Sequence, residues 1–174
     1  MNALAVLLPS LVAVGVLLVL SAFFSSSESA IFALPDEWIR TVGSEGSADG
    51  RTLQRLRSDP HRLLVTILVG NNVVNIAITS IVTLLVARFV PPGATVVVAT
   101  VCVSVLVLVF GEIVPKSYGF GHAQSWALRV ARPLSYVERA LGPLVFLFDA
   151  GTRRLTALVG GDVHIEESLL DDEP

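Results

Sequence analysis

The heptapeptide FGEIVPK, residues 110–116, places a carboxylate, a proline and an ammonium directly after an uncharged, largely apolar run at residues 94–109. Ionisable side chains within a membrane segment are energetically costly, and each one is therefore a functional hypothesis. Pro115 has no backbone N–H, which leaves a carbonyl group in the preceding turn without its helical partner. Either a buried cation satisfies that carbonyl, or Pro115 and Lys116 simply end a helix at the membrane surface.

The composition of the whole chain places it in a membrane. Hydrophobic residues make up 53% of the 174 residues, and the mean hydropathy is +0.73, values typical of an integral membrane protein. The net charge of -3 argues against nucleic-acid binding, which usually needs a basic surface. A serine hydrolase acting within the membrane would need a base at that depth, where the sequence has no histidine. We therefore do not expect an enzyme.

Three segments are long and apolar enough to cross the membrane as helices, at residues 4–34, 62–90 and 94–118. A hydrocarbon core of about 30 Å needs about 20 helical residues. No basic residue precedes the first segment and no A-x-A cleavage site follows it, so we expect a span there and not a signal peptide. The PPG turn at residues 91–93 makes the second and third spans an antiparallel pair. The predicted fold class is an all-α integral membrane protein with three transmembrane helices.

The segment between the first two spans, residues 35–62, is polar and carries five arginines. Its Ser/Gly-rich part at residues 43–50 is expected to be a flexible insert. Asp59 followed by Pro60 is typical of a helix start, with the aspartate as N-cap and the proline in the first turn.

The sequence after the third span is amphipathic. Residues 122–158 are predicted to form short juxtamembrane helices that lie on the membrane surface and are broken by Pro133 and Pro143. No uncharged run there is long enough for a fourth crossing. We therefore expect a transmembrane domain over residues 1–160, followed by an acidic tail at residues 161–174 that leads toward a cytoplasmic region.

Basic residues gather on one side of the predicted membrane. The segment between the first two spans and the part after the third hold most arginines and Lys116, whereas the intervening turn has only Arg88 beside it. Positively charged segments tend to stay in the cytoplasm. The N-terminus is therefore predicted outside and the C-terminus inside, in a multi-pass protein of the cell membrane.

Polar side chains from the three spans lie at a similar distance from the cytoplasmic edge. A helical rise of about 1.5 Å per residue places Ser25, Asn72 and Glu112 roughly 10–15 Å from that edge. Hydroxyl, amide and carboxylate oxygens, without thiolate or imidazole groups, suit Mg²⁺, Ca²⁺ or Na⁺ better than zinc or copper. The sequence therefore predicts a cation site between the three spans.

Helical periodicity groups the candidate ligands on shared faces. Ser21 and Ser25 lie one turn apart on the first span, and Glu28 lies on an adjoining face. Asn72 and Asn75 are likewise one turn apart on the second span. Serine and asparagine are also common at helix–helix contacts in membranes, so close packing is the alternative role for these residues.

Glu112 is the hardest of these residues to explain by packing. One alternative is an ion pair with Lys116, four residues later on the same helix. Such a pair would neutralise the site and leave it a purely structural role.

Three motifs resemble, in the same order, those of the transmembrane module of the cyclin M (CNNM)/CorC magnesium transporter family. They are FFSSSESA at residues 23–30, GNNVVN at residues 70–75 and FGEIVPK at residues 110–116. The resemblance covers nearly the whole chain. It implies a homodimer whose protomers each have three transmembrane helices and a juxtamembrane helical belt. It also implies Mg²⁺ export coupled to Na⁺ influx, from a site open to the cytoplasm.

The resemblance also implies roles for individual residues. The implied ligands of a largely dehydrated Mg²⁺ come from all three spans and are Ser21, Ser25, Asn72, Gly111 and Glu112. Glu28 and Asn75 are further candidates beside them. Pro115 would produce a distorted, π-like turn that frees carbonyl groups near Gly111, and Lys116 would stabilise that turn.

Members of this family usually continue into cytoplasmic ATP-binding modules. The present chain stops at Pro174, before any such module, so ATP regulation is not assigned to these residues. The alternative to transport is a regulatory or scaffold membrane protein that senses Mg²⁺ and moves none. Flux with and without a Na⁺ gradient would separate the two functions.

Overall fold

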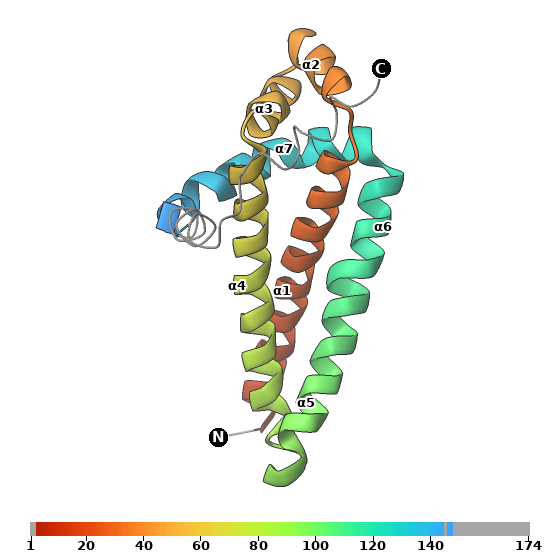
Figure 1. The fold of residues 1–174 in the computed structure, drawn as a ribbon. Helices are drawn as coiled ribbons and strands as arrows, with labels where there is room; N and C mark the ends of the chain where they lie inside the picture. The colour runs from red at the N-terminus through yellow and green to blue at the C-terminus, as the bar shows by residue number, and fades with distance from the viewer. Residues whose placement is uncertain (1–2, 145, 148–174) are drawn as a thin grey trace, which may run out of the picture.

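The computed structural model describes residues 3–144, 146 and 147, and all regular elements in this part are helices (Figure 1). The predicted helical residues 148–158 and the acidic tail at residues 161–174 lie outside the described residues. The elements in chain order are α1 (Ala3–Phe32), α2 (Asp36–Ser44), α3 (Ala48–Arg57), α4 (Pro60–Val86), α5 (Pro92–Leu106), the π-helix η1 (Val107–Ile113), α6 (Val114–Gly121) and α7 (Ala123–Ala140).

Three stretches of the described chain are helices long and apolar enough to cross a membrane. They are Leu7–Phe32, Pro60–Val86 and Pro92–Gly121, the last of which consists of α5, η1 and α6 end to end. Each predicted span matches one of them to within a few residues at each end. The prediction of an all-helical protein with three candidate membrane spans is confirmed.

The first span is the central element of the bundle. α1 packs along α4 on one side and along η1 and α6 on the other, while α4 also packs against α5 (Figure 1). Small side chains on α1, among them Ser21, Ser25 and Ala30, are almost completely buried. Lipid is as apolar as leucine, so helices associate in membranes mainly through close packing of such small residues. The serine-rich motif at residues 23–30 therefore belongs to the surface of α1 on which the other helices pack.

The polar segment after α1 is folded into helices. Residues 43–50 were predicted to be a flexible insert, and this prediction is wrong. Ser47 is the N-cap of α3, where its side chain accepts a hydrogen bond from the Gly50 amide at 2.9 Å. Leu53 is fully buried, and α3 packs against α2 and α7. Capping and burial thus order a stretch whose composition suggested a loop.

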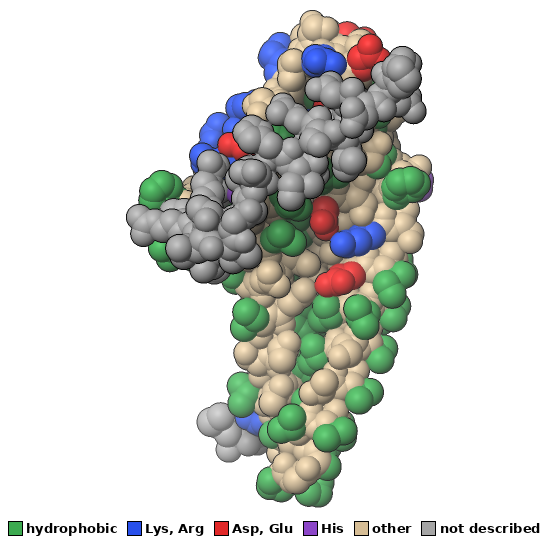
Figure 2. All heavy atoms as spheres, in the orientation of Figure 1, with side chains coloured by type: hydrophobic (Ala, Val, Ile, Leu, Met, Phe, Trp, Pro, Cys, Tyr) green, Lys and Arg blue, Asp and Glu red, His purple; other side chains and the backbone are tan. Residues whose placement is uncertain are grey.

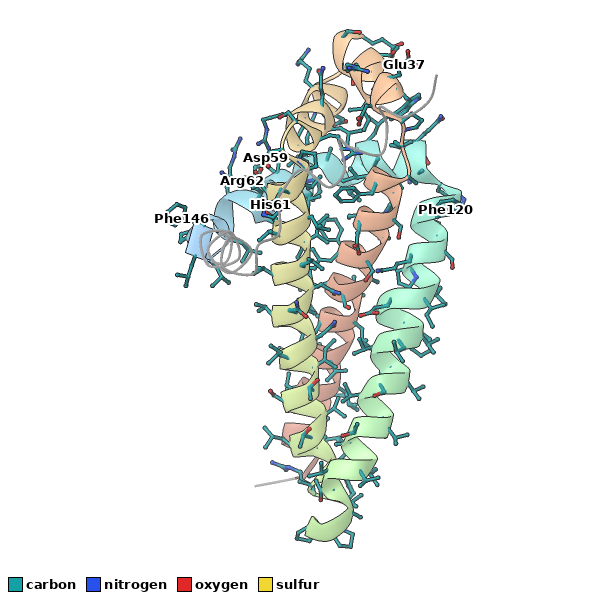
Figure 3. The ribbon with its side chains drawn as sticks, viewed as in Figure 1. Glu37, Asp59, His61, Arg62, Phe120 and Phe146 are labelled. Carbon is teal, nitrogen blue, oxygen red and sulfur yellow. The ribbon has the colours of Figure 1, made fainter. Side chains whose placement is uncertain are left out.

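The predicted start of the second span is confirmed. The Asp59 side chain accepts a hydrogen bond from the backbone amide of Arg62 at 3.0 Å, and Pro60 is the first residue of α4. Figure 3 shows Asp59 and Arg62 at the end of α4 that adjoins α3.

The amphipathic helix α7 continues through Pro133, so the prediction that this proline breaks the helix is wrong. Pro133 lies on an exposed face, where water can hydrate the carbonyl group that loses its helical partner. The opposite face carries Val130 and Leu134, which are buried in the contact with α3 and α1. α7 ends at Ala140, shortly before Pro143, as predicted for that proline.

A buried carboxylate joins three helices at this end of the bundle. Glu138 of α7 contacts Arg55 of α3 and Arg62 of α4, each at 3.0 Å and each through a different carboxylate oxygen. The Glu138 side chain is only 10% exposed, whereas those of Arg55 and Arg62 are 47% and 53% exposed. The two ion pairs hold α7 against the start of the second span.

Replacing Glu138 with glutamine is expected to lower the free energy of unfolding by about 1–2 kcal/mol, because the charge-assisted bonds are lost but the two arginines stay hydrated. Thermal unfolding in detergent, followed by circular dichroism, would measure the change. Glu45→Gln, at an exposed position after α2, is the matched control. Equal melting temperatures for the two variants would contradict a stabilising role for Glu138.

Candidate metal centre

Ser21 on α1, which is buried, and two partly buried asparagines on α4 form an oxygen cluster. The Ser21 Oγ atom lies 3.0 Å from Oδ1 of Asn71 and 2.9 Å from Oδ1 of Asn75, and Ser21 has no exposed surface (0%). Asn71 and Asn75 are one helical turn apart, so both side chains point toward α1. Two amide oxygens therefore converge on a single hydroxyl group.

The third span approaches this cluster through Gly111. A Cβ atom on Gly111 would lie 2.7 Å from Ser21 Oγ, so a larger residue would clash. Gly111 is buried within η1. The absence of a side chain thus brings the backbone of η1 next to the oxygens of α1 and α4.

The backbone around Gly111 forms a π-helix, at the position where the family resemblance implied a π-like turn. The Val114 amide donates a hydrogen bond to the carbonyl of Val109, five residues earlier. Pro115 has no amide hydrogen, so neither Gly111 nor Phe110 can receive the bond that another residue at that position would donate. This segment therefore offers backbone oxygens close to Ser21.

Ser25 lies one turn further along α1 and carries an unpartnered hydroxyl group. The residue is 1% exposed, and within the described part of the chain its Oγ atom has no hydrogen-bond partner. The next two serines differ, because Ser26 and Ser27 each donate to a carbonyl of their own helix, at 2.7 Å and 2.6 Å. A buried hydroxyl without a partner costs about 1–3 kcal/mol, so Ser25 is a candidate ligand.

Glu112 follows Gly111 and is half-buried. Among the residues that the structure describes, no cation or hydrogen-bond donor contacts its carboxylate. Lys116 instead lies 3.2 Å from Glu28 of α1, so the alternative of a Glu112–Lys116 pair is wrong. Within the described part of the chain, Glu112 therefore has an unpartnered carboxyl group in a candidate membrane span, which makes it a candidate cation ligand.

The Glu28–Lys116 pair lines a cleft of about 660 Å³ between α1, α4 and α6. Ser29, which also lines the cleft, is one turn beyond Ser25 on the same face of α1. Figure 2 shows acidic and basic side chains on this otherwise mostly uncharged flank of the bundle, below the layer of short helices. The cleft therefore extends from Arg57 at the basic end of the bundle to Ser29, one turn from Ser25.

Asn72 does not join the cluster. It is exposed and lies with Leu68, Val73 and Ile76 in an apolar groove along α4. Successive helical residues point about 100° apart, so Asn72 cannot face Ser21 while Asn71 does. Of the predicted ligands, the structure brings Ser21 and Gly111 close together. Ser25 follows Ser21 one turn later on α1, and Glu112 follows Gly111 in η1.

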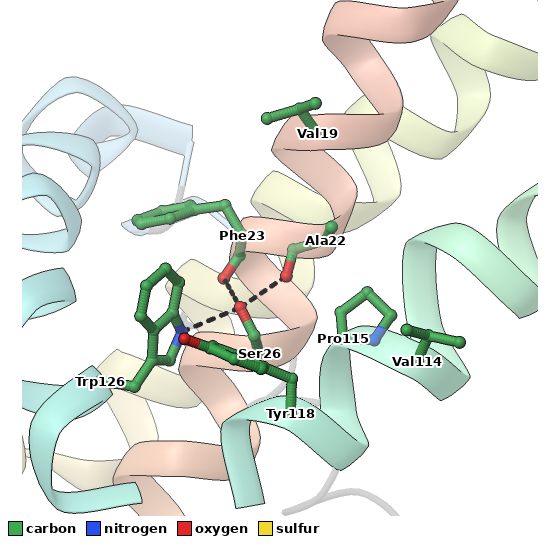
Figure 4. Close-up of a pocket in the computed structure, with 8 residues that line it drawn as sticks. All are labelled: Val19, Ala22, Phe23, Ser26, Val114, Pro115, Tyr118 and Trp126. Atoms are coloured by element: carbon green, nitrogen blue, oxygen red, sulfur yellow. Dashed lines mark hydrogen bonds between the residues drawn. The ribbon is translucent and has the colours of Figure 1, made fainter. Parts of the chain in front are cut away.

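Two residues outside the predicted set take part in this region. Asn71 has a recognisable signal in the sequence, namely its one-turn spacing from Asn75. Trp126 of α7 has none, because its partner is distant in the chain. Its Nε1–H group donates to Ser26 Oγ at 3.0 Å, as Figure 4 shows. This bond ties α7 to α1 at the residue next to Ser25.

The arrangement suits a hard cation. The oxygens in this region belong to hydroxyl, amide, carboxyl and backbone carbonyl groups. Among the described residues, no group of three or more His, Cys, Asp or Glu side chains could hold a metal ion. Mg²⁺, Ca²⁺ and Na⁺ prefer such oxygens. The partners of Ser21 are amides, which offer no base to activate a serine nucleophile.

Comparison with curated proteins finds relatives over most of the chain. A UPF0053 protein of Haemophilus influenzae is 31% identical over 156 residues, which are 90% of this chain and 37% of the relative. The UPF0053 inner membrane protein YfjD of Escherichia coli is 31% identical over 88% of this chain and 36% of its own length. A chloroplastic DUF21 domain-containing protein of Arabidopsis thaliana is 39% identical over 91% of this chain and 24% of its own length.

The chain thus spans between about a quarter and two fifths of the length of these relatives. Its residues 11–173 match the family described as the cyclin M transmembrane N-terminal domain. That match covers all three candidate membrane spans except the first four residues of Leu7–Phe32. The chain belongs to the cyclin M (CNNM) transmembrane-domain family.

Proposed function

We propose that this chain is the membrane core of a Mg²⁺ transporter that exports Mg²⁺ in exchange for Na⁺ influx. The observation that carries the proposal is the Glu112 carboxylate, which has no partner among the described residues and belongs to a π-helix packed against α1, the helix that carries the unpartnered Ser25 hydroxyl. A dication is the partner that such a set of oxygens lacks. Membership of the CNNM family supports the same ion, because the three motifs resemble those of magnesium transporters.

In this proposal Ser25, Glu112 and the Gly111 carbonyl bind Mg²⁺, and Ser21 borders the site. Asn72 joins them only if α4 rotates about its axis, since in the present state it points away. Such a rotation would make Asn72 a ligand in one state of the transport cycle and not in the other.

The surrounding residues would control access to the ion. Pro115 maintains free carbonyl groups in η1, and the Glu28–Lys116 pair stands in the cleft through which Mg²⁺ arrives. Asn75 is engaged with Ser21 and acts beside the Mg²⁺ site.

We further propose that the chain resides in the cell membrane as a homodimer, with the N-terminus outside and the basic helical layer in the cytoplasm. The placement of α2, α3 and α7 at one end of the bundle supports this orientation, because most arginines lie there. The greater length of the relatives supports cytoplasmic regions beyond this domain, for which we propose ATP-binding modules.

Flux measurements on reconstituted protein test the proposal. Liposomes loaded with Mg²⁺ and containing the chain are expected to release Mg²⁺ faster when an inward Na⁺ gradient is imposed. A K⁺ gradient of equal size should not accelerate release. Mg²⁺ binding without any flux would instead identify a Mg²⁺ sensor, and the absence of both would refute the proposed site.

A further inference from the structure

A mostly apolar cavity of about 460 Å³ lies between α1, α6 and α7. Figure 4 shows Phe23 and Trp126 on one side of it and Pro115 on the other. Val19 and Val114 also line the cavity and are 70% and 58% exposed on the flank of the bundle. Both valines belong to candidate membrane spans, so in a bilayer the cavity opens toward hydrocarbon.

Two polar groups in the wall of the cavity satisfy each other. The Trp126 Nε1–H group donates to Ser26 Oγ at 3.0 Å, and that hydroxyl group donates to the Ala22 carbonyl at 2.7 Å. The Trp126 ring also meets the Tyr118 ring edge to face, with centroids 5.3 Å apart, which fixes its orientation. A preformed cavity with paired polar groups favours an apolar occupant, because a polar one would lose its hydration without gaining a partner.

Helix α7 carries an arginine at the border of the membrane. Trp126 faces α1 at the level of Ser26, inside a candidate span, whereas Arg132 pairs with Asp49 of α3 in the layer of short helices. Successive helical residues point about 100° apart, so Arg129 lies midway between these two directions, at the level expected for lipid headgroups. It is exposed, and its guanidinium group has no acidic partner among the residues that the structure describes.

We propose that the cavity and Arg129 together bind an anionic phospholipid of the leaflet next to the short helices. One acyl chain lies in the cavity and packs on Pro115 and Trp126, and the headgroup phosphate pairs with Arg129. Basic side chains at a membrane surface attract anionic lipids, and tryptophan and tyrosine are typical of this level of the bilayer. The inference goes beyond the proposed transport function and does not depend on it, because none of the candidate Mg²⁺ ligands lines the cavity.

Quenching of Trp126 fluorescence tests the inference, because bromine atoms on a lipid chain quench tryptophan on contact. The chain has two tryptophans, so Trp38→Phe leaves Trp126 as the reporter. The full chain is reconstituted in phosphatidylcholine vesicles with increasing fractions of brominated phosphatidylglycerol or brominated phosphatidylcholine. Half-maximal quenching is expected at an about fivefold lower fraction of the phosphatidylglycerol, which corresponds to roughly 1 kcal/mol. If Trp38→Phe does not fold, Trp38 is kept as a constant background, since it lies outside the candidate spans.

Arg129→Gln is expected to abolish the preference, so that the two brominated lipids quench equally. Arg139→Gln is the matched control and should keep the fivefold preference, because Arg139 is exposed on the same side of α7 as Arg132. Equal quenching by the two lipids before either arginine is changed, or an unchanged preference in Arg129→Gln, would overturn the inference. Loss of the preference in both variants would also overturn it, by showing a general attraction to the basic layer. Competition by inorganic phosphate would do the same, by showing a site for a free anion.

Discussion

Replacing Glu112 with glutamine is expected to reduce Na⁺-driven Mg²⁺ efflux from liposomes about 100-fold or more, since losing even an outer partner of a metal ligand costs 10–100-fold. Glutamine keeps the shape and one oxygen of the side chain but removes its charge. The Glu112 carboxylate has no ion-pair or hydrogen-bond partner among the described residues, so the variant breaks no contact of the fold. Any loss of transport would therefore result from weaker binding of the ion and not from a disturbed fold.

The same substitution at Glu37 is the matched control. Glu37 is exposed on α2, outside the candidate spans, as Figure 3 shows. Glu37→Gln is expected to transport at the rate of the unaltered protein. Gel filtration and melting temperature should be unchanged in both variants. If Glu112→Gln retained normal efflux, the carboxylate would not be a ligand and the proposed Mg²⁺ site would be lost.

Replacing Gly119 with valine is expected to destabilise the protein by about 3 kcal/mol or more, because overpacking a close helix contact forces the backbones apart. A Cβ atom on Gly119 would run into the backbone carbonyl of Ser26 on α1. A backbone group cannot move aside as a flexible side chain can. α6 would therefore separate from α1 next to the Trp126–Ser26 hydrogen bond.

Gly121→Val, two residues later in the same helix, is the control. Nothing lies within 4 Å of a Cβ atom at Gly121, so its effect should stay within about 0.5 kcal/mol. Thermal unfolding in detergent would measure both variants. Equal melting temperatures would show that α6 does not pack on α1 as closely as the structure has it.

Several features of the fold were predictable because their causes are local in the sequence. The Asp59-Pro60 start of α4 follows from capping chemistry, and the disturbed turn before Pro115 follows from a missing amide hydrogen. Helices α2 and α3 were not predicted, because their order depends on burial of residues such as Leu53 against distant α7. Helical continuity at Pro133 likewise depends on which face of α7 remains exposed.

The candidate site shows the same division. The sequence identified Ser21, Ser25 and Glu112 as unusual polar residues at membrane depth. It could not choose between Asn71 and Asn72, which are adjacent and of the same type. It also could not identify Glu28 as the partner of Lys116, because the two residues come from different spans.

By itself, the sequence determined that the chain has three helices able to cross a membrane and carries oxygen-bearing polar side chains on each. Each helix that crosses a bilayer must be long and apolar enough by itself, and both properties can be read from the local hydropathy of the sequence. Only the tertiary structure decided which oxygens meet. The rotation of each helix about its axis is set by contacts such as Gly111 with Ser21, and one residue of difference turns a side chain by about 100°.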